Sequence, residues 1–307
     1  DSIHHPVVAR HGMVVTQNEL ASRVGQNILE QGGNAIDATV AIGFALAVTL
    51  PRAGNLGGSG FMLIHMEQSQ ETVALDFRSL APTAARLEDF LDEDGDILWD
   101  DLTFGVRAPA VPGTVAGLYH AWQKFGSLPW PLLLAPAINL AKEGIVVSDD
   151  LAYALAEAMP IMSQYPSSIV TYARDADNSY LAGEILHQPD LAWSLERISE
   201  QGANAFYSGD IAEKIVDFMD RSGGYISSQD LQNYQVKERE PIATNYRQHK
   251  VVTMPPSSVG GVALLQMLNV LKQFDLSRIF CISVIFELVY EGGLIDGLRD
   301  FLLNHQY

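Results

Sequence analysis

One stretch of the sequence, AIDATVAIGFALAVTL from Ala35 to Leu50, is apolar on nearly every side of a helix. A helix of this kind must be surrounded by other parts of the protein. It is too short for the roughly 20 apolar residues that cross a bilayer. Asn34 precedes it, Asp37 is favourable in its first turn and Pro51 ends it. We therefore predict a buried core helix in a globular fold, and no membrane-spanning segment.

Capping signals and turn residues predict the elements on either side of this helix. Asn18 can cap an earlier helix whose apolar residues fall at helical spacing, and Gly32-Gly33 supplies the usual left-handed stop. After the core helix, the glycine-rich segment GNLGGSG (54–60) leads into two apolar runs, FMLIHM and ETVALDFRS. These runs have strand character and are joined by a polar turn, so we predict a hairpin.

The rest of the chain mixes helices and strands. Helical character is found at 113–125, 131–143, 190–201 and 210–221. YISSQDLQNY is predicted to form a short capped turn of helix, PIATNYRQHKVVTMP two strands, and Val262 to Phe274 a helix after the pair Gly260-Gly261. Because the elements do not alternate as βαβ units, we predict an α+β fold built from packed layers.

Composition excludes several classes of partner. The 307 residues are 48% hydrophobic, which is enough to fill a sizeable core. Lys and Arg number 19 against 37 Asp and Glu, and a formal charge of -18 repels nucleic-acid phosphates and anionic membrane surfaces. The single cysteine, Cys281, excludes an internal disulfide framework and a multi-cysteine metal site. No nucleic-acid partner, metal or cofactor is predicted.

Arg78 is the candidate binding residue, in the segment LDFRSLAPTAA. It ends an apolar run with strand character, and Pro82 ends the extended segment soon after. A guanidinium at such a strand-loop junction can hold a carboxylate bidentately, and each charge-assisted hydrogen bond contributes about 1.5 to 3 kcal/mol. The residue pattern alone leaves open a surface arginine paired with one of the chain's many acids.

Three other segments have the composition of ligand sites, but each favours a structural role. The glycine-rich segment 54–60 could bind an anion, but it lacks the Lys and Ser/Thr of a P-loop, so close backbone packing is favoured over nucleotide binding. The acidic run LEDFLDEDGDILWDD lacks EF-hand spacing, and Asp94-Gly95 is predicted to form a hairpin tip. PPSSVGG (255–261) could form an anion nest, but a strand-to-helix junction is favoured.

The order of ten motifs along the chain carries a resemblance that no single motif does. They are HPVVARHGMV, LEQGGNAIDATVA, GNLGGSGFMLI, DFRSLAP, PAVPGTVAGL, FGSLPW, PAINLAKEGIVVS, FYSGDIAEKI, GGYISSQDLQNY and MPPSSVGG. In this order they resemble the large subunit of a γ-glutamyltranspeptidase (glutathione hydrolase), from about His5 to about Leu276. This part, 1–276, is expected to be the large-subunit-like domain.

The resemblance implies an N-terminal-nucleophile hydrolase, an αββα four-layer sandwich of which this chain supplies only the large-subunit part. It implies a precursor that cleaves itself into two subunits and transfers a γ-glutamyl group, through a Thr acyl-enzyme, to water or an acceptor. The implied partners are the small subunit and γ-glutamyl peptides such as glutathione. The implied location is periplasmic or extracellular. Arg78 matches the family's arginine for the α-carboxylate of the γ-glutamyl group.

Three departures from the family pattern bear on activity. Ser59 stands where the family usually has glycine, a change that is either harmless or strained if the loop needs positive φ. Residues 277–307 are expected to be a divergent apolar tail, which a frameshifted or truncated precursor would produce. None of the ten threonines lies in a Thr-Thr-His type sequence, so no catalytic residue is predicted here. We expect this chain alone to be inactive; the alternative function is a truncated fragment that binds glutamate-like carboxylates at most.

Overall fold

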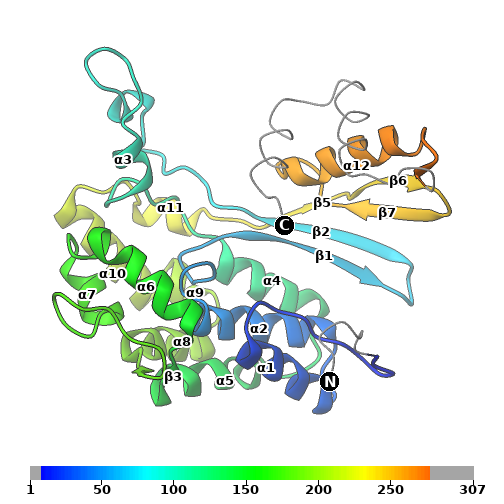
Figure 1. The fold of residues 1–307 in the computed structure, drawn as a ribbon, viewed down its shortest axis with the longest axis horizontal. Helices are drawn as coiled ribbons and strands as arrows, with labels where there is room; N and C mark the ends of the chain where they lie inside the picture. Colours follow the sequence, from blue (N-terminus) through cyan, green and yellow to red (C-terminus); the bar gives the residue numbers. More distant parts are fainter. Residues whose placement is uncertain (1–7, 277–307) are drawn as a thin grey trace. The chain divides into compact units, whose positions relative to one another are not determined.

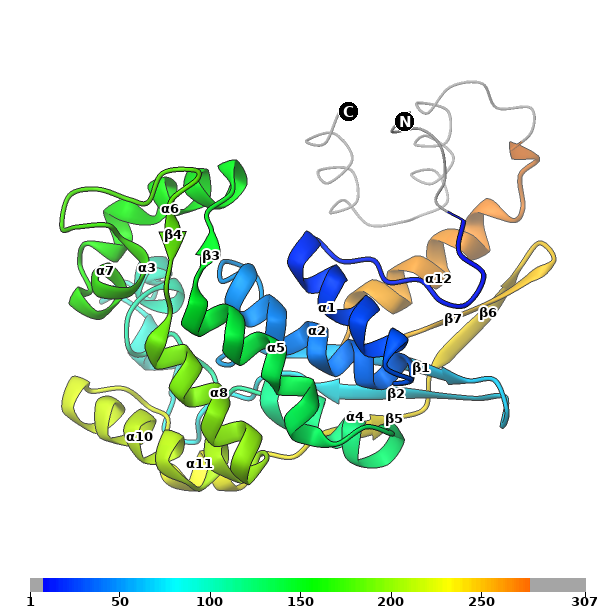
Figure 2. The same ribbon diagram turned by 90° about the horizontal axis from the view of Figure 1, so that it is seen from below.

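The computed structural model describes residues 8–276, which divide into two compact units. The first unit contains residues 8–60 and 77–236, and the second contains 61–76 and 237–276. Figures 1 and 2 show the first unit as mostly helical and the second as strands with one helix. The predicted mixture of helices and strands is therefore confirmed. The segment 277–307, predicted as a divergent tail, lies outside the described residues.

The core of the first unit is the predicted apolar helix. Helix α1 (Glu19–Glu30) begins where Asn18 accepts a hydrogen bond from the Ala21 N–H, and α2 (Ala35–Thr49) begins with a capping box between Asn34 and Asp37. Phe44 of α2 is completely buried. Helix α2 packs against α1 and α5 (Trp130–Glu143), and α5 packs against α8 (Pro189–Gln201), an arrangement visible in Figure 2. Both predicted helices are confirmed.

Asp37 ties the start of α2 to a distant turn. Its side chain is fully buried, and it accepts hydrogen bonds from the Asn34 N–H, from the hydroxyl and N–H of Ser127, and from the Leu128 N–H. Burial raises the pKa of this carboxyl, but the hydrogen bonds from Ser127, Asn34 and Leu128 lower it by more than burial raises it. The pKa of Asp37 therefore lies below the ordinary value. The buried charge is thus held by donors rather than by a cation.

Most predicted helices of the first unit are present. Helices α4 (Thr114–Phe125), α5, α8 and α10 (Asp210–Ser222) match the four predicted segments, and α11 (Ser228–Gln232) matches the predicted short capped turn. The remaining elements of this unit were not predicted. They are η1 (Leu87–Phe90), α3 (Trp99–Thr103), α6 (Asp149–Met162), α7 (Pro166–Tyr172), α9 (Asn204–Tyr207) and the short pair β3 (Ile145–Val146) and β4 (Ile185–Leu186).

The second unit is built on strands. The predicted hairpin forms β1 (Gly60–Met66) and β2 (Glu71–Phe77), and β5 (Lys237–Arg239) joins β2 antiparallel with Asp76 opposite Lys237. The buried Asp76 accepts hydrogen bonds from Arg239 Nε at 2.6 Å and from Ser257 Oγ at 3.2 Å. Strands β6 (Ile242–Tyr246) and β7 (His249–Thr253) form the second predicted pair.

Helix α12 (Val259–Leu271) packs on β6, but it begins earlier than predicted. The pair Gly260-Gly261 was expected before the helix and instead lies in its first turn. A β-carbon at Gly261 would overlap the Met254 carbonyl oxygen, so this glycine permits a close backbone approach rather than a turn. The predicted strand-to-helix junction at 255–261 is otherwise confirmed.

Candidate functional site

Arg78 follows β2 directly and its side chain is exposed, at the strand-loop junction that the sequence predicts. The residue before it is anchored: Phe77 is buried, and its ring fills the space where β-carbons at Gly60 and Gly117 would otherwise stand. The chain is held again at Leu80, whose N–H and C=O form two hydrogen bonds with Val111, of 3.2 and 2.8 Å. The backbone that carries the Arg78 side chain is thus held in place on both sides.

Asp230 of α11 holds the end of the Arg78 segment. Its carboxylate accepts hydrogen bonds from the N–H and hydroxyl of Thr83, at 3.0 and 2.5 Å, and from the N–H and hydroxyl of Ser227, at 3.0 and 2.6 Å. Burial raises the pKa of this carboxyl, but the hydrogen bonds from Ser227 and Thr83 outweigh it and lower the pKa from 3.8 to about 2. Sequence reasoning missed Asp230.

This lowered pKa predicts an acid-dependent loss of stability. Above about pH 5 the charged Asp230 stabilises the fold by about 2 kcal/mol, because its folded pKa lies below its unfolded one. The contribution falls as the pH drops from about 4 toward 2. Urea unfolding measures how much more stable wild type is than Asp230→Asn. We expect this difference in free energy of unfolding to be about 1 kcal/mol smaller at pH 3 than at pH 6. An unchanged difference between the two pH values would contradict this assignment.

The glycine-rich segment 54–60 lies beside the Arg78 segment. The Gly58 carbonyl accepts hydrogen bonds from the N–H groups of Gly113 and Thr114, at 2.8 and 3.1 Å. Ser59 Oγ donates to Ser79 Oγ at 3.4 Å. None of residues 54–60 has a positive φ, so Ser59 fits without backbone strain. The favoured role of close backbone packing is confirmed by these contacts and by Gly60 against the Phe77 ring.

The other segments with ligand-like composition have structural roles. Asp92 Oδ1 accepts hydrogen bonds from the N–H groups of Asp94 and Asp96, and Gly95 has φ 85° at the predicted hairpin tip. Within residues 8–276, no group of His, Cys, Asp or Glu side chains has the arrangement of a metal site. In the same part of the chain, no helix has the length and apolarity required to span a membrane.

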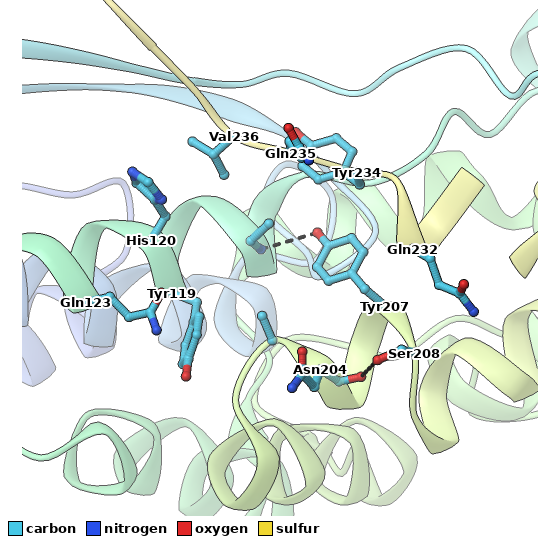
Figure 3. Close-up of a pocket in the computed structure, with 12 residues that line it drawn as sticks. Tyr119, His120, Gln123, Asn204, Tyr207, Ser208, Gln232, Tyr234, Gln235 and Val236 are labelled. Carbon is cyan, nitrogen blue, oxygen red and sulfur yellow. Dashed lines mark hydrogen bonds between the residues drawn. The ribbon is translucent and has the colours of Figure 1, made fainter. Parts of the chain in front are cut away.

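A polar pocket of about 420 Å³ is lined by residues of α4, of α9 and of the segment between α11 and β5 (Figure 3). Tyr207 and Tyr234, which are buried, belong to its lining together with the exposed amides of Gln123 and Asn204. Arg78 is not part of the lining. Both tyrosines stand in motifs that carry the family resemblance, FYSGDIAEKI and GGYISSQDLQNY, but no residue pattern within these motifs indicates a site residue at either position.

The family model described as Gamma-glutamyltranspeptidase matches residues 21–285 of the chain. The chain belongs to the γ-glutamyltranspeptidase family. The match includes the 54–60 loop and the Arg78 segment, together with the Gly113 and Asp230 positions that hold it. It also includes residues 277–285, the first part of the segment predicted to diverge.

Similar proteins and a similar structure agree with this assignment. The chain is 42% identical to the glutathione hydrolase proenzyme of Escherichia coli over 279 residues, 91% of this chain and 48% of that protein. It is 36% identical to the Acylase ACY 1 proenzyme of Pseudomonas sp. over 89% of this chain and 50% of that protein. The chain thus spans about half the length of these curated relatives.

The crystal structure of Helicobacter pylori γ-glutamyltranspeptidase superimposes with a TM-score of 0.90 at 41% identity, over 94% of this chain and 82% of that one. The predicted fold class, the large-subunit part of an N-terminal-nucleophile hydrolase, is confirmed.

Proposed function

We propose that this chain is the substrate-binding half of an enzyme that hydrolyses or transfers the γ-glutamyl group of glutathione and related γ-glutamyl peptides. The observation that carries the proposal is the place of Arg78: an exposed guanidinium on a backbone anchored on both sides, inside the region that the family model matches. In this proposal Arg78 binds the α-carboxylate of the γ-glutamyl group.

The chemistry of arginine suits this role. A guanidinium stays charged at every physiological pH and presents paired N–H donors that match the two oxygens of a carboxylate. Binding the α-carboxylate places the γ-amide, which is the bond to be broken, at a set distance along the glutamyl side chain. Arg78 therefore orients the substrate and does not itself attack it.

The partner in this proposal is a small subunit made from the same precursor, which supplies a threonine nucleophile for the acyl-enzyme. The E. coli and Pseudomonas relatives are both named proenzymes, which supports a precursor of this kind. We also propose, from the family resemblance, that the enzyme acts in the periplasm or outside the cell. The match to a γ-glutamyltranspeptidase structure over 94% of the chain supports this function over an inactive fragment.

A chimeric proenzyme tests this function. Residues 21–276 of this chain would replace the aligned half of the E. coli glutathione hydrolase proenzyme. We expect the self-cleaved chimera to release p-nitroaniline from γ-glutamyl-p-nitroanilide, but not from butanoyl-p-nitroanilide, which lacks the α-amino and α-carboxylate groups. Equal rates on the two anilides would favour a general acylase. A self-cleaved chimera with no γ-glutamyl activity would contradict the proposal.

A further inference from the structure

The main chain of Arg78 has a third anchor, in addition to Phe77 and Leu80. The Tyr234 hydroxyl donates a hydrogen bond to the Arg78 carbonyl oxygen at 2.9 Å. Tyr234 lies between α11 and β5, and only 9% of it is exposed. This bond therefore joins the backbone of the candidate binding residue to a buried side chain far away in the sequence.

Tyr234 is itself held by a second buried tyrosine. The rings of Tyr207 and Tyr234 stack with centroids 5.5 Å apart and an interplanar angle of 13°. The Tyr207 hydroxyl donates to the Pro112 carbonyl at 2.9 Å and accepts from the Ala116 N–H at 3.2 Å, the contact drawn in Figure 3. Burial raises the pKa of Tyr207, so its hydroxyl stays a donor. Each tyrosine of the stacked pair thus donates its hydroxyl to a backbone carbonyl, Tyr234 to that of Arg78 and Tyr207 to that of Pro112.

Gly113 provides the space in which these segments meet. A β-carbon at this position would overlap both the Phe77 carbonyl oxygen and the Tyr234 hydroxyl oxygen. The Gly113 N–H is in turn bonded to the Gly58 carbonyl at 2.8 Å. Three segments therefore meet near the Tyr234 hydroxyl, which bonds the Arg78 carbonyl: the 54–60 loop, the start of α4 and the end of β2.

We propose that Tyr234 is a positioning residue for γ-glutamyl binding, because its hydroxyl fixes the main chain from which the Arg78 guanidinium reaches the carboxylate. The inference rests on the proposed function. Tyr234 acts on the Arg78 carbonyl and not on the ligand, so its hydroxyl contributes by reducing the backbone freedom that binding would otherwise have to remove.

The substitution that isolates this effect is Tyr234→Phe. It removes the hydroxyl but keeps the ring that stacks on Tyr207, so the hydrophobic packing is retained. Tyr119→Phe is the matched control: Tyr119 lines the same pocket, and its ring packs on Trp122 and Trp130. Both variants lose one tyrosine hydroxyl from the same region of the first unit.

The experiment titrates the full chain with glutamate by calorimetry and measures hydrogen-deuterium exchange in peptides that cover 78–83. We expect Tyr234→Phe to weaken glutamate binding roughly three- to tenfold, the loss of one neutral hydrogen bond. Exchange at 78–83 should become faster. Tyr119→Phe should match wild type in both measurements, and the two variants should have similar melting temperatures.

The outcomes separate this inference from the proposed function. Unchanged affinity and exchange in Tyr234→Phe would overturn the inference, and so would an equal loss of affinity in Tyr119→Phe. If Arg78→Ala binds glutamate as tightly as wild type, the proposed role of Arg78 fails instead. If wild type binds no glutamate, hydrogen exchange at 78–83 still tests whether Tyr234 anchors this segment. Exchange as slow in Tyr234→Phe as in wild type would overturn the inference.

Discussion

Gly113→Ala is expected to lower the free energy of unfolding by about 3 kcal/mol, a large part of the total stability of a typical domain. The added methyl group would overlap the Phe77 carbonyl oxygen and the Tyr234 hydroxyl. Relief requires the backbone at the end of β2 to shift, which breaks the hydrogen bond from Tyr234 to Arg78. Overpacking costs about 1 to 3 kcal/mol and the lost hydrogen bond about 1 kcal/mol. Urea denaturation measures the sum.

The matched control for this variant is Gly54→Ala. Gly54 lies in the same unit and has no positive φ, and its added β-carbon would have ordinary contacts of 3.5 Å or more with Leu46. The control should change the free energy of unfolding by less than about 1 kcal/mol. Equal effects at Gly113 and Gly54 would show that the backbone behind Arg78 is not tightly packed.

Arg78→Ala in the chimeric proenzyme is expected to lower kcat/KM for γ-glutamyl-p-nitroanilide by about 10²- to 10⁴-fold. In the proposed role of Arg78, the variant loses two charge-assisted hydrogen bonds to the α-carboxylate of about 1.5 to 3 kcal/mol each, and each 1.4 kcal/mol corresponds to a tenfold change. Arg78→Lys should retain an intermediate rate, because an ammonium keeps the charge but not the paired donors. Steady-state kinetics on the self-cleaved chimera measures these ratios.

The control for Arg78→Ala is Arg86→Ala. Arg86 is an exposed arginine of the same loop, and its guanidinium donates hydrogen bonds to the nearby Thr83 and Ala85 carbonyls. Its loss should leave kcat/KM within about threefold of wild type. A similar loss at both arginines would indicate a general effect of positive charge near the site.

Elements with local signals were predicted well from the sequence. Helices α1 and α2 carry their own caps at Asn18 and Asn34, and their burial follows from the spacing of apolar residues. Helix α6 was missed although Ser148 caps it and acids follow, because Pro160 in its last turn obscured the pattern. Strand β5 has the sequence Lys-Glu-Arg, which has no strand character. It is a strand because it pairs with β2, a contact that its own sequence does not indicate.

The site divides in the same way. The motif around Arg78 predicted its place at a strand-loop junction. The contacts that fix this segment could not be predicted, because they join residues far apart: Tyr234 and Arg78 are 156 positions apart, and Asp230 and Thr83 are 147. Gly113 stands in the motif PAVPGTVAGL, but its role could not be predicted, since its importance comes from the backbone oxygen and hydroxyl that surround it in the folded chain.

The proposed contact between Arg78 and an α-carboxylate is tested most directly by a calorimetric cycle on the full chain. Wild type and Arg78→Ala would each be titrated with glutamate and with isoglutamine, in which an amide replaces the α-carboxylate. We predict that isoglutamine binds wild type at least tenfold more weakly than glutamate does, and that Arg78→Ala binds both ligands equally weakly, because the same pair of groups is removed from either side. If Arg78→Ala still prefers glutamate by the wild-type ratio, another group holds the α-carboxylate and the proposed role of Arg78 is wrong.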